Sequence, residues 1–201
     1  PYDLAAAGKP NIIWVTTLND ISADRSVRRI RLWQSVCDGA SGTAYPSAAL
    51  VTAARLAGNG KADAMTSFLS WRVAVECGRS ETVDAPAWPP ARRQAAQLPY
   101  VFGNDAASPA KLRLDTPSGP EVVLRRISAG RLVNYADGQA SPAGDVDRDP
   151  FAGRVTIIGA SYTESADVHE TPLGTMPGSL ILANSIVQAQ TLTDTVPASP
   201  L

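Results

Sequence analysis

The C-terminal part of the chain shows the clearest change between apolar and polar stretches. Val155–Ile158 is an uncharged run rich in β-branched side chains, which predicts a strand buried on both faces. Gly159 ends this run, and residues 161–178 are polar and interrupted by prolines and glycines, which predicts a long loop. After Gly178, apolar residues recur at helical spacing as far as Leu192, which predicts a helix. The pattern therefore predicts a strand, a loop and a helix in that order.

The first part of the chain predicts two strands, a connection between them and one helix. Asn11–Thr17 and Val27–Trp33 have the apolar and β-branched residues typical of strands, and the polar residues 19–26 between them predict a turn or a hairpin. Residues 48–58 predict a helix, with Ser47 as its N-terminal cap. The many alanines of this helix predict that it packs closely on a neighbouring element.

Further strands are predicted between these two regions. Residues 112–125 predict a strand, a turn and a second strand, and residues 71–75 predict a short strand. The overall prediction is an α/β fold, with a central mixed sheet, helices packed against it and a long loop after the strand at 155–158. A chain of 201 residues can bury a substantial core. We interpret residues 1–201 as a single domain.

The charge balance excludes one class of partner. The chain has 18 Lys and Arg against 19 Asp and Glu, and its net charge is −1. A near-neutral chain lacks the general attraction to phosphate that nucleic-acid binding needs, so we expect no nucleic acid as partner. No apolar run reaches the length of about 20 residues that spans a membrane. The start at Pro1 has no signal-peptide pattern and no methionine, which indicates a processed or excised piece.

The two cysteines bear on the compartment of the domain. Cys37 and Cys77 each lie beside glycine and polar residues typical of surface turns. Neither belongs to a CxxC pair, so a zinc site is not expected. We favour a disulfide between them, which would place the domain in an oxidising compartment and stabilise it by about 3–4 kcal/mol. Two separate reduced thiols are the alternative.

The predicted loop carries side chains that could bind a metal ion. Glu164, Asp167, His169 and Glu170 offer oxygen and nitrogen ligands within a few residues, and His169 is the chain's one histidine. The spacing is not that of an EF-hand, and a second histidine is missing, so we expect no metal site. Gly159 is followed by a loop too long for a dinucleotide-binding turn, so we expect no cofactor.

The same region resembles part of a hydrolase motif. Gly159 and Ser161 follow the predicted strand as in a nucleophile elbow, and His169 could act as the base. That motif needs a second glycine at the position of Thr163, and its histidine lies far downstream of the serine. A hydrolase that uses Ser161, Asp167 and His169 stays an alternative interpretation.

The chain has one basic cluster, between Arg25 and Arg31. On a strand, Arg29 and Arg31 share a face, where they could meet an anionic ligand. We favour the other interpretation, a solvated face whose arginines pair with Asp20 or Asp24.

Several motifs resemble the type-two CHASE domain, the extracytoplasmic sensor of bacterial adenylate cyclases, histidine kinases and similar receptors. The acidic turn and double arginine at 24–32 and the Tyr-Pro-Ser helix start at 45–50 are similar to parts of that family. Because the family usually opens with further strands, the chain resembles the later part of the domain or a diverged version. The family's closing signature is similar to residues 155–160, Asp167, Thr171–Gly174, Met176–Gly178 and Ala183–Ile186.

The resemblance implies a periplasmic sensory domain of an inner-membrane receptor, without catalytic residues of its own. It implies membrane spans on both sides of the domain in the parent protein, a small-molecule or protein ligand, and self-association through the parent receptor. A cytoplasmic output domain such as a cyclase or kinase would receive the signal. A structural dimerisation module is a further alternative. Ligand binding or organisation of the loop is assigned to Asp167, His169, Thr171, Met176, Asn184 and Arg29.

Overall fold

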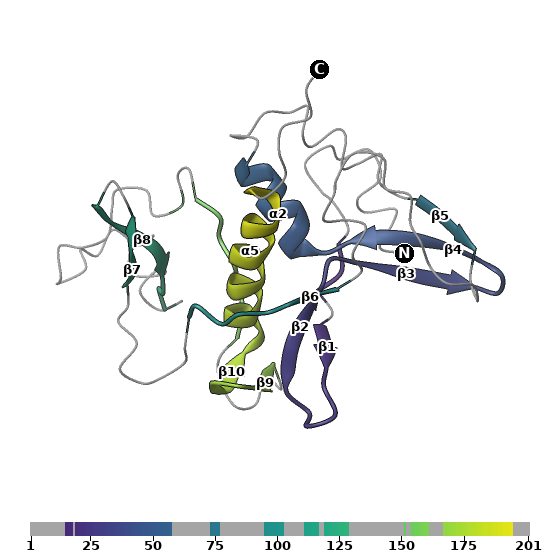
Figure 1. Cartoon of the computed structure of the whole chain (residues 1–201), viewed down its shortest axis with the longest axis horizontal. Coiled ribbons are helices and arrows are strands. Elements are labelled where there is room, and N and C mark those ends of the chain that lie inside the picture. Colours follow the sequence, from purple (N-terminus) through teal and green to yellow (C-terminus); the bar gives the residue numbers. More distant parts are fainter. Residues whose placement is uncertain are drawn as a thin grey trace, which may run out of the picture.

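The computed structural model describes residues 15–17, 19–57, 73–76, 95–102, 111–116, 119–128, 151, 154–160 and 167–194. Short strands and two helices alternate within these ranges (Figure 1). The elements are β1 (Asn19–Ile21), β2 (Val27–Arg31), β3 (Trp33–Asp38), β4 (Ser41–Pro46), α2 (Ala48–Ala57), β5 (Val73–Glu76), β6 (Ala95–Gln97), β7 (Lys111–Thr116), β8 (Gly119–Arg125), β9 (Val168–Thr171), β10 (Gly174–Pro177) and α5 (Gly178–Asp194).

The predicted α/β class is confirmed, although the strands are arranged differently from the prediction. The described strands form separate antiparallel sheets, β1-β2-β6, β3-β4-β5, β7-β8 and β9-β10, and not one central mixed sheet. The helices α2 and α5 pack on each other near the middle of the molecule, with the β1-β2-β6 and β3-β4-β5 sheets to one side and β7-β8 to the other (Figure 1). Sheets of two or three strands bury little surface by themselves, so the helix pair supplies much of the common packing surface.

The hydrophobic core lies between the two helices and the nearest strands. A small cluster joins Ala49 and Ala53 of α2 to Ile186 and Ala189 of α5. Alanine side chains let helix axes approach closely, so the predicted close packing of this helix on a neighbour is confirmed. The main core cluster holds buried residues from both helices, from β2, β3, β4, β6 and β10, and from the segment after β6: Val27, Ile30, Leu32, Trp33, Ala44, Leu50, Ala54, Ala96, Leu98, Phe102, Met176, Leu180, Ile181 and Ala183.

The start of α2 is fixed as the sequence predicts. The backbone N–H of Leu50 donates to Oγ of Ser47 at 3.1 Å, which is an N-terminal cap. Thr16 pairs with Ser47 in a parallel bridge, and its carbonyl oxygen accepts the N–H of Ala48 at 2.9 Å. The rest of the strand predicted at residues 11–17 lies largely outside the described residues.

The strand predicted at Val27–Trp33 is present as β2 over Val27–Arg31, but its hairpin partner β1 lies within residues 19–26, which were predicted as the connection. The hairpin has a bulge that explains its double arginine. Ile21 pairs with Val27 and Asp20 pairs with Arg29, so Arg28 is an extra residue in β2. The bulge lets Val27 and Ile30 both point into the core, whereas Arg28 and Arg29 are both exposed.

The buried strand predicted at Val155–Ile158 is wrong. Residues 154–160 form no strand, and the side chains of Val155 and Ile158 are 44% and 95% exposed. Only Ile157 packs against the core clusters. A strand that is buried on both faces needs a neighbour at each edge, and none of the described strands pairs with this segment.

The long loop predicted at residues 161–178 is also wrong over its second half. Residues 161–166 lie outside the described residues, whereas β9 and β10 form an antiparallel hairpin that leads directly into α5. The prolines and glycines of this stretch therefore mark a tight turn and a helix start rather than irregular chain. Neither helix in the described part of the chain is long and apolar enough to cross a membrane.

The turn of the β1–β2 hairpin predicts a pH dependence of stability. Hydrogen bonds from Arg28 and Ser26 hold the pKa of Asp24 well below its usual value of 3.8. A carboxylate whose pKa is lowered in the folded state stabilises the fold above its unfolded-state pKa, and this contribution is lost as the pH falls towards the folded-state pKa. Asp24→Asn should therefore lower the melting temperature at neutral pH, and the difference from wild type should shrink between about pH 5 and pH 2.

Thermal unfolding of both proteins across this pH range measures the effect. Asp38→Asn, which removes an exposed carboxylate from the end of β3, is the matched control. A difference between wild type and Asp24→Asn that stays constant or grows on acidification would contradict the assignment.

Candidate functional site

All but one of the residues predicted to bind a ligand or to organise the loop lie in, or directly beside, the β9–β10 hairpin and α5. Asp167 comes directly before β9, His169 and Thr171 lie in β9, Met176 lies in β10 and Asn184 lies in α5. The stretch is continuous in sequence, and β10 ends at the residue before α5 begins. These residues therefore belong to one structural unit.

The turn of the hairpin is held by the side chain of Thr171. Its Oγ1 donates to the carbonyl oxygen of Gly174 at 2.5 Å and accepts the N–H of Leu173 at 3.2 Å. Pro172 fixes its own φ near −65°, and Gly174 has a φ of 92°, which favours glycine. The turn is therefore well defined, and it carries the side chain of Leu173 into solvent.

Asp167 links the start of the hairpin to the start of α5. The carbonyl oxygen of Asp167 accepts the N–H of Gly178 at 3.0 Å, and a Cβ atom at Gly178 would collide with the Asp167 carboxylate. A side chain at position 178 would therefore displace the Asp167 carboxylate. The Asp167 carboxylate lies beside Gly178, the first residue of α5. A carboxylate in that place interacts favourably with the positive end of the helix dipole. Oδ1 of Asp167 lies 3.3 Å from Nε2 of His169, and both side chains are about two-fifths exposed, 42% and 41%.

Asn184 connects α5 to a segment far away in sequence. Its side chain is completely buried, and Oδ1 accepts the N–H groups of Val101 and Phe102, each at 2.8 Å. Its Nδ2 donates to the carbonyl oxygens of Phe102 at 3.1 Å and Leu180 at 2.9 Å. A buried amide in this arrangement satisfies both of its own polar atoms and several backbone groups.

Met176 completes the inner side of the unit. Its side chain is fully buried, and it pairs with His169 across the hairpin. Its Sδ lies 3.8 Å from Nδ2 of Asn184. Met176 therefore joins the hairpin to the buried amide and to the core.

The segment at residues 98–102 is the part of this site that the sequence did not identify. Tyr100 donates its hydroxyl proton to the carbonyl oxygen of Val27 at 2.7 Å, and burial raises its pKa to about 12, so the hydroxyl stays protonated and can donate. The segment is thus fastened to β2 by Tyr100 and to α5 by Asn184. Its only sequence signal is the apolar run Tyr100–Phe102, which indicates packing but not the partner.

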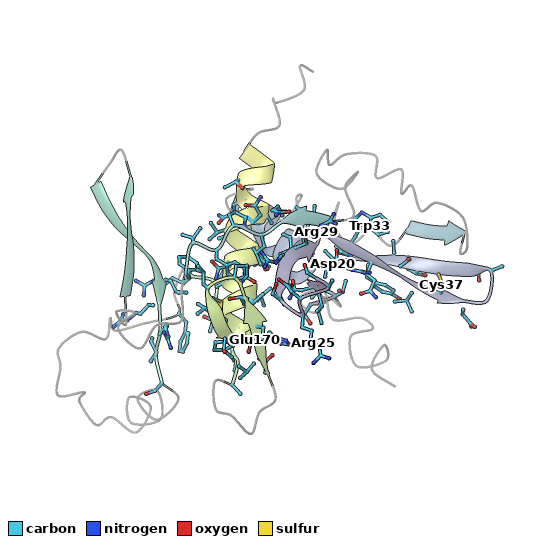
Figure 2. All side chains as sticks on the ribbon, turned by 60° about the horizontal axis from the view of Figure 1, so that its bottom comes forward. Asp20, Arg25, Arg29, Trp33, Cys37 and Glu170 are labelled. Carbon is cyan, nitrogen blue, oxygen red and sulfur yellow. The ribbon has the colours of Figure 1, made fainter. Side chains whose placement is uncertain are left out.

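Arg29 lies outside this unit, on the β1-β2-β6 sheet. It pairs with Asp20 on one side and Gln97 on the other. Asp20 is bonded by Nε of Arg31 at 2.5 Å, and Asp24 by Arg28, which supports the interpretation of a solvated face with ion pairs. No hydrogen bond or ion pair joins the Arg29 side chain to another described residue. Figure 2 shows Arg29 on β2, and it shows Glu170 of β9 near Arg25 at neighbouring ends of the two hairpins.

The described contacts of this unit fix its backbone and its packing on the core. The described residues contain no cluster of His, Cys, Asp and Glu that could hold a metal ion. Among them, His169 is hydrogen-bonded only to Asp167, and no described hydroxyl or thiol lies within hydrogen-bond reach of its ring. Ser161, the nucleophile of the hydrolase interpretation, lies outside the described residues. Ligand binding by the predicted site residues stays a prediction.

The buried amide predicts a large effect of substitution at position 184. Asn184→Leu removes the acceptor of the buried Phe102 N–H and of the part-buried Val101 N–H. A buried N–H left without a partner costs about 1–3 kcal/mol. We expect a loss of about 2–4 kcal/mol in the free energy of unfolding, measured by urea denaturation.

Gln188→Leu is the matched control, since Gln188 lies one helical turn later in α5 and is only half-buried. It should change the free energy of unfolding by no more than about 0.5 kcal/mol. Equal losses in the two variants would show that the hydrogen bonds of Asn184 are not the cause.

The chain was compared with known proteins. No curated protein and no solved structure gives a significant match. One family model, described as the CHASE2 domain, matches residues 6–200, which is nearly the whole chain. This confirms the resemblance to the type-two CHASE domain. The chain therefore belongs to the CHASE2 family, a family of extracellular sensory domains of signalling receptors and not of enzymes.

Proposed function

We propose that this CHASE2 domain is the periplasmic sensor of an inner-membrane receptor. It detects a small ligand or a partner protein at the β9–β10 hairpin. It then passes a displacement through α5 towards a membrane span and a cytoplasmic output domain, for example a cyclase or kinase. Membership of a family of extracellular sensory domains supports this role.

The observation that carries this proposal is the direct continuation of the hairpin into α5. Pro177 ends β10 and Gly178 begins the helix, so no flexible linker separates them. The N–H of Gly178 is bonded to Asp167 at the other end of the hairpin. A contact that moves the hairpin therefore also moves the first turn of α5.

The helix can carry such a displacement along the molecule. It starts at the hairpin and runs past α2 (Figure 1). Almost all of its described side chains are buried or half-buried, and it carries no charge before Asp194. Densely packed helices shift between discrete arrangements rather than deforming continuously. A ligand acts on them only through a different affinity for the two arrangements.

The unit presents partly exposed groups to a ligand. Asp167 and His169 are each partly exposed at the end of the hairpin beside α5, and Leu173 extends from the turn at its other end. The imidazole and the carboxylate suit a small polar molecule, and the apolar side chain suits a protein surface. The bonds of Thr171 and Gly178 hold the backbone that carries these groups.

A disulfide between Cys37 and Cys77 is part of the proposal, because it fits a periplasmic location. Cys37 is disulfide-bonded, whereas Cys77 lies outside the described residues. Cys77 is the chain's other cysteine, so it is the partner available to Cys37. Such bonds are typical of oxidising compartments such as the periplasm.

Thermal shift of the 201-residue domain tests the sensing proposal. The probes are amino acids, dicarboxylates, sugars and inorganic phosphate, each at millimolar concentration. A ligand at one hundred times its Kd adds about 2.7 kcal/mol of stability. For a chain of this size that raises the melting temperature by about 5–11 °C. His169→Gln should abolish the shift caused by the active compound.

Val36→Thr, at an exposed position of β3, is the control and should keep the shift. His169→Gln and Asp167→Asn are then introduced into the parent receptor. If no compound stabilises the domain and Asp167→Asn leaves the receptor's output unchanged, the proposed role of this hairpin is wrong.

A further inference from the structure

The β1–β2 hairpin is tied to α5 by a route that does not pass through the β9–β10 hairpin. β6 pairs with β2 from Arg29 to Arg31, and the chain then continues across α5 (Figure 1). Beyond β6, the segment at residues 98–102 is bonded to β2 at one end and to Asn184 of α5 at the other. This segment therefore connects a hairpin whose turn is exposed with a helix that is largely buried.

The segment is attached to β2 at the bulge. The N–H of Leu98 donates to the carbonyl oxygen of the inserted residue Arg28 at 2.8 Å, and the hydroxyl of Tyr100 donates to the carbonyl oxygen of Val27 at 2.7 Å. A bulge disrupts the regular ladder, so its backbone groups are available to partners from another element. The carbonyl groups of both residues at the bulge are taken by the segment at residues 98–102.

The side chain at the bulge also holds the turn of the hairpin. The Arg28 guanidinium donates to Oδ2 of Asp24 from Nε at 3.2 Å and from Nη2 at 2.5 Å. Oδ1 of Asp24 accepts the N–H of Ser26 at 3.1 Å and its hydroxyl proton at 2.6 Å. The turn and the bulge are thus fastened to each other, so a displacement of the turn also displaces the bulge.

The other end of the segment is bonded to the first half of α5. The N–H groups of Val101 and Phe102 donate to Oδ1 of Asn184, and the side chain of Phe102 lies in the main core cluster. Tyr100 and Val101 are consecutive, so the residue that is bonded to β2 adjoins a residue that is bonded to α5. A connection this short, bonded at both ends, leaves little room for the hairpin and the helix to move independently.

We propose that the β1–β2 hairpin is a second input to α5, and that Tyr100 is the positioning residue that couples the two. A displacement of the turn at residues 22–26 passes through the bulge to Tyr100, and from there to Asn184 and the helix. The two hairpins then act on one helix at different places, β9–β10 at its first turn and β1–β2 at Asn184. Such coupling is reciprocal, so a shift of α5 also changes the stability of the turn. The inference goes beyond ligand detection at the β9–β10 hairpin and does not depend on it.

A second route between the same elements has to be separated from this one. β2 also lies beside β9, and the β9–β10 hairpin is bonded to α5 through the N–H of Gly178. That route does not use the hydroxyl of Tyr100. Tyr100→Phe removes the hydrogen bond to Val27 but keeps the aromatic ring that packs against the core cluster. The substitution therefore interrupts one route and leaves the other intact.

Native-state hydrogen exchange of the 201-residue chain tests the proposal. Asp24→Asn removes the ion pair with Arg28 and loosens the turn. If the turn and the helix are coupled, the amides of Val101 and Phe102 should exchange about two- to fivefold faster, which is the range for the loss of an exposed ion pair. Asp38→Asn, at the exposed end of β3, is the matched control and should leave both rates unchanged.

The double variant shows whether Tyr100 carries the effect. In a chain with Tyr100→Phe, adding Asp24→Asn should change the exchange rates of Val101 and Phe102 by less than about 1.5-fold, because the turn and the helix no longer open together. A purely structural hydroxyl would behave differently. Its loss would make both amides exchange faster, but the factor caused by Asp24→Asn would be the same with and without it.

Two results with these variants would overturn the proposal. Asp24→Asn leaves the rates of Val101 and Phe102 unchanged in the chain that retains Tyr100, or it raises them by the same factor in both backgrounds. The second result would assign the effect to β9 or to unfolding of the whole domain. The wild type alone gives a further measurement, the opening free energies in increasing urea. The amides of β2 should converge with those of Val101 and Phe102, and hairpin amides that open separately at every urea concentration would contradict the coupling.

Discussion

The buried amide of Asn184 is the interaction on which the arrangement of this domain depends. Its oxygen accepts two consecutive N–H groups, of Val101 and Phe102, from a segment about 80 residues earlier in the chain. Its nitrogen donates to carbonyl oxygens of that segment and of α5 itself. Without such a partner, the N–H groups of Val101 and Phe102 would lie unpaired beside α5, and unpaired backbone groups are costly where they are buried. The amide therefore decides which segment covers α5.

The same constraint explains why α5 occupies the centre of the fold. The described side chains of α5 are almost all buried or half-buried, so other elements surround the helix. On one side α2 meets it through alanines, and on another the 98–102 segment meets it through Asn184. At its start, Gly178 and Asp167 connect it to the hairpin. The sensor proposal follows from this arrangement, because the part of the unit open to solvent and the buried helix are fastened to each other at several points.

Features set by neighbouring residues were predictable from the sequence. The cap at Ser47, the helix after Gly178 and the strand that begins at Val27 depend on local patterns, and all are present. The bulge at Arg28 was not predicted, because an alternating pattern gives no sign of an inserted residue. The short strands β9 and β10 were mistaken for a loop, since they lack apolar alternation and their pairing depends on the Thr171–Gly174 turn.

Features that depend on distant partners were not predictable. Val155–Ile158 has the composition of a buried strand, but composition does not say whether a neighbouring strand is available. The site residues between 167 and 184 lie together because they are close in sequence. The sequence could not show that Asn184 binds residues 101–102, because those partners are backbone groups, which every residue type possesses.

The central claim is that the 101–102 segment and the first half of α5 form one cooperative unit held by Asn184. Native-state hydrogen exchange of individual amides tests this claim most directly. The Val101 and Phe102 amides should exchange slowly, with the same opening free energy as the buried amides of α5. Fast exchange of these two amides while α5 stays protected would contradict the account.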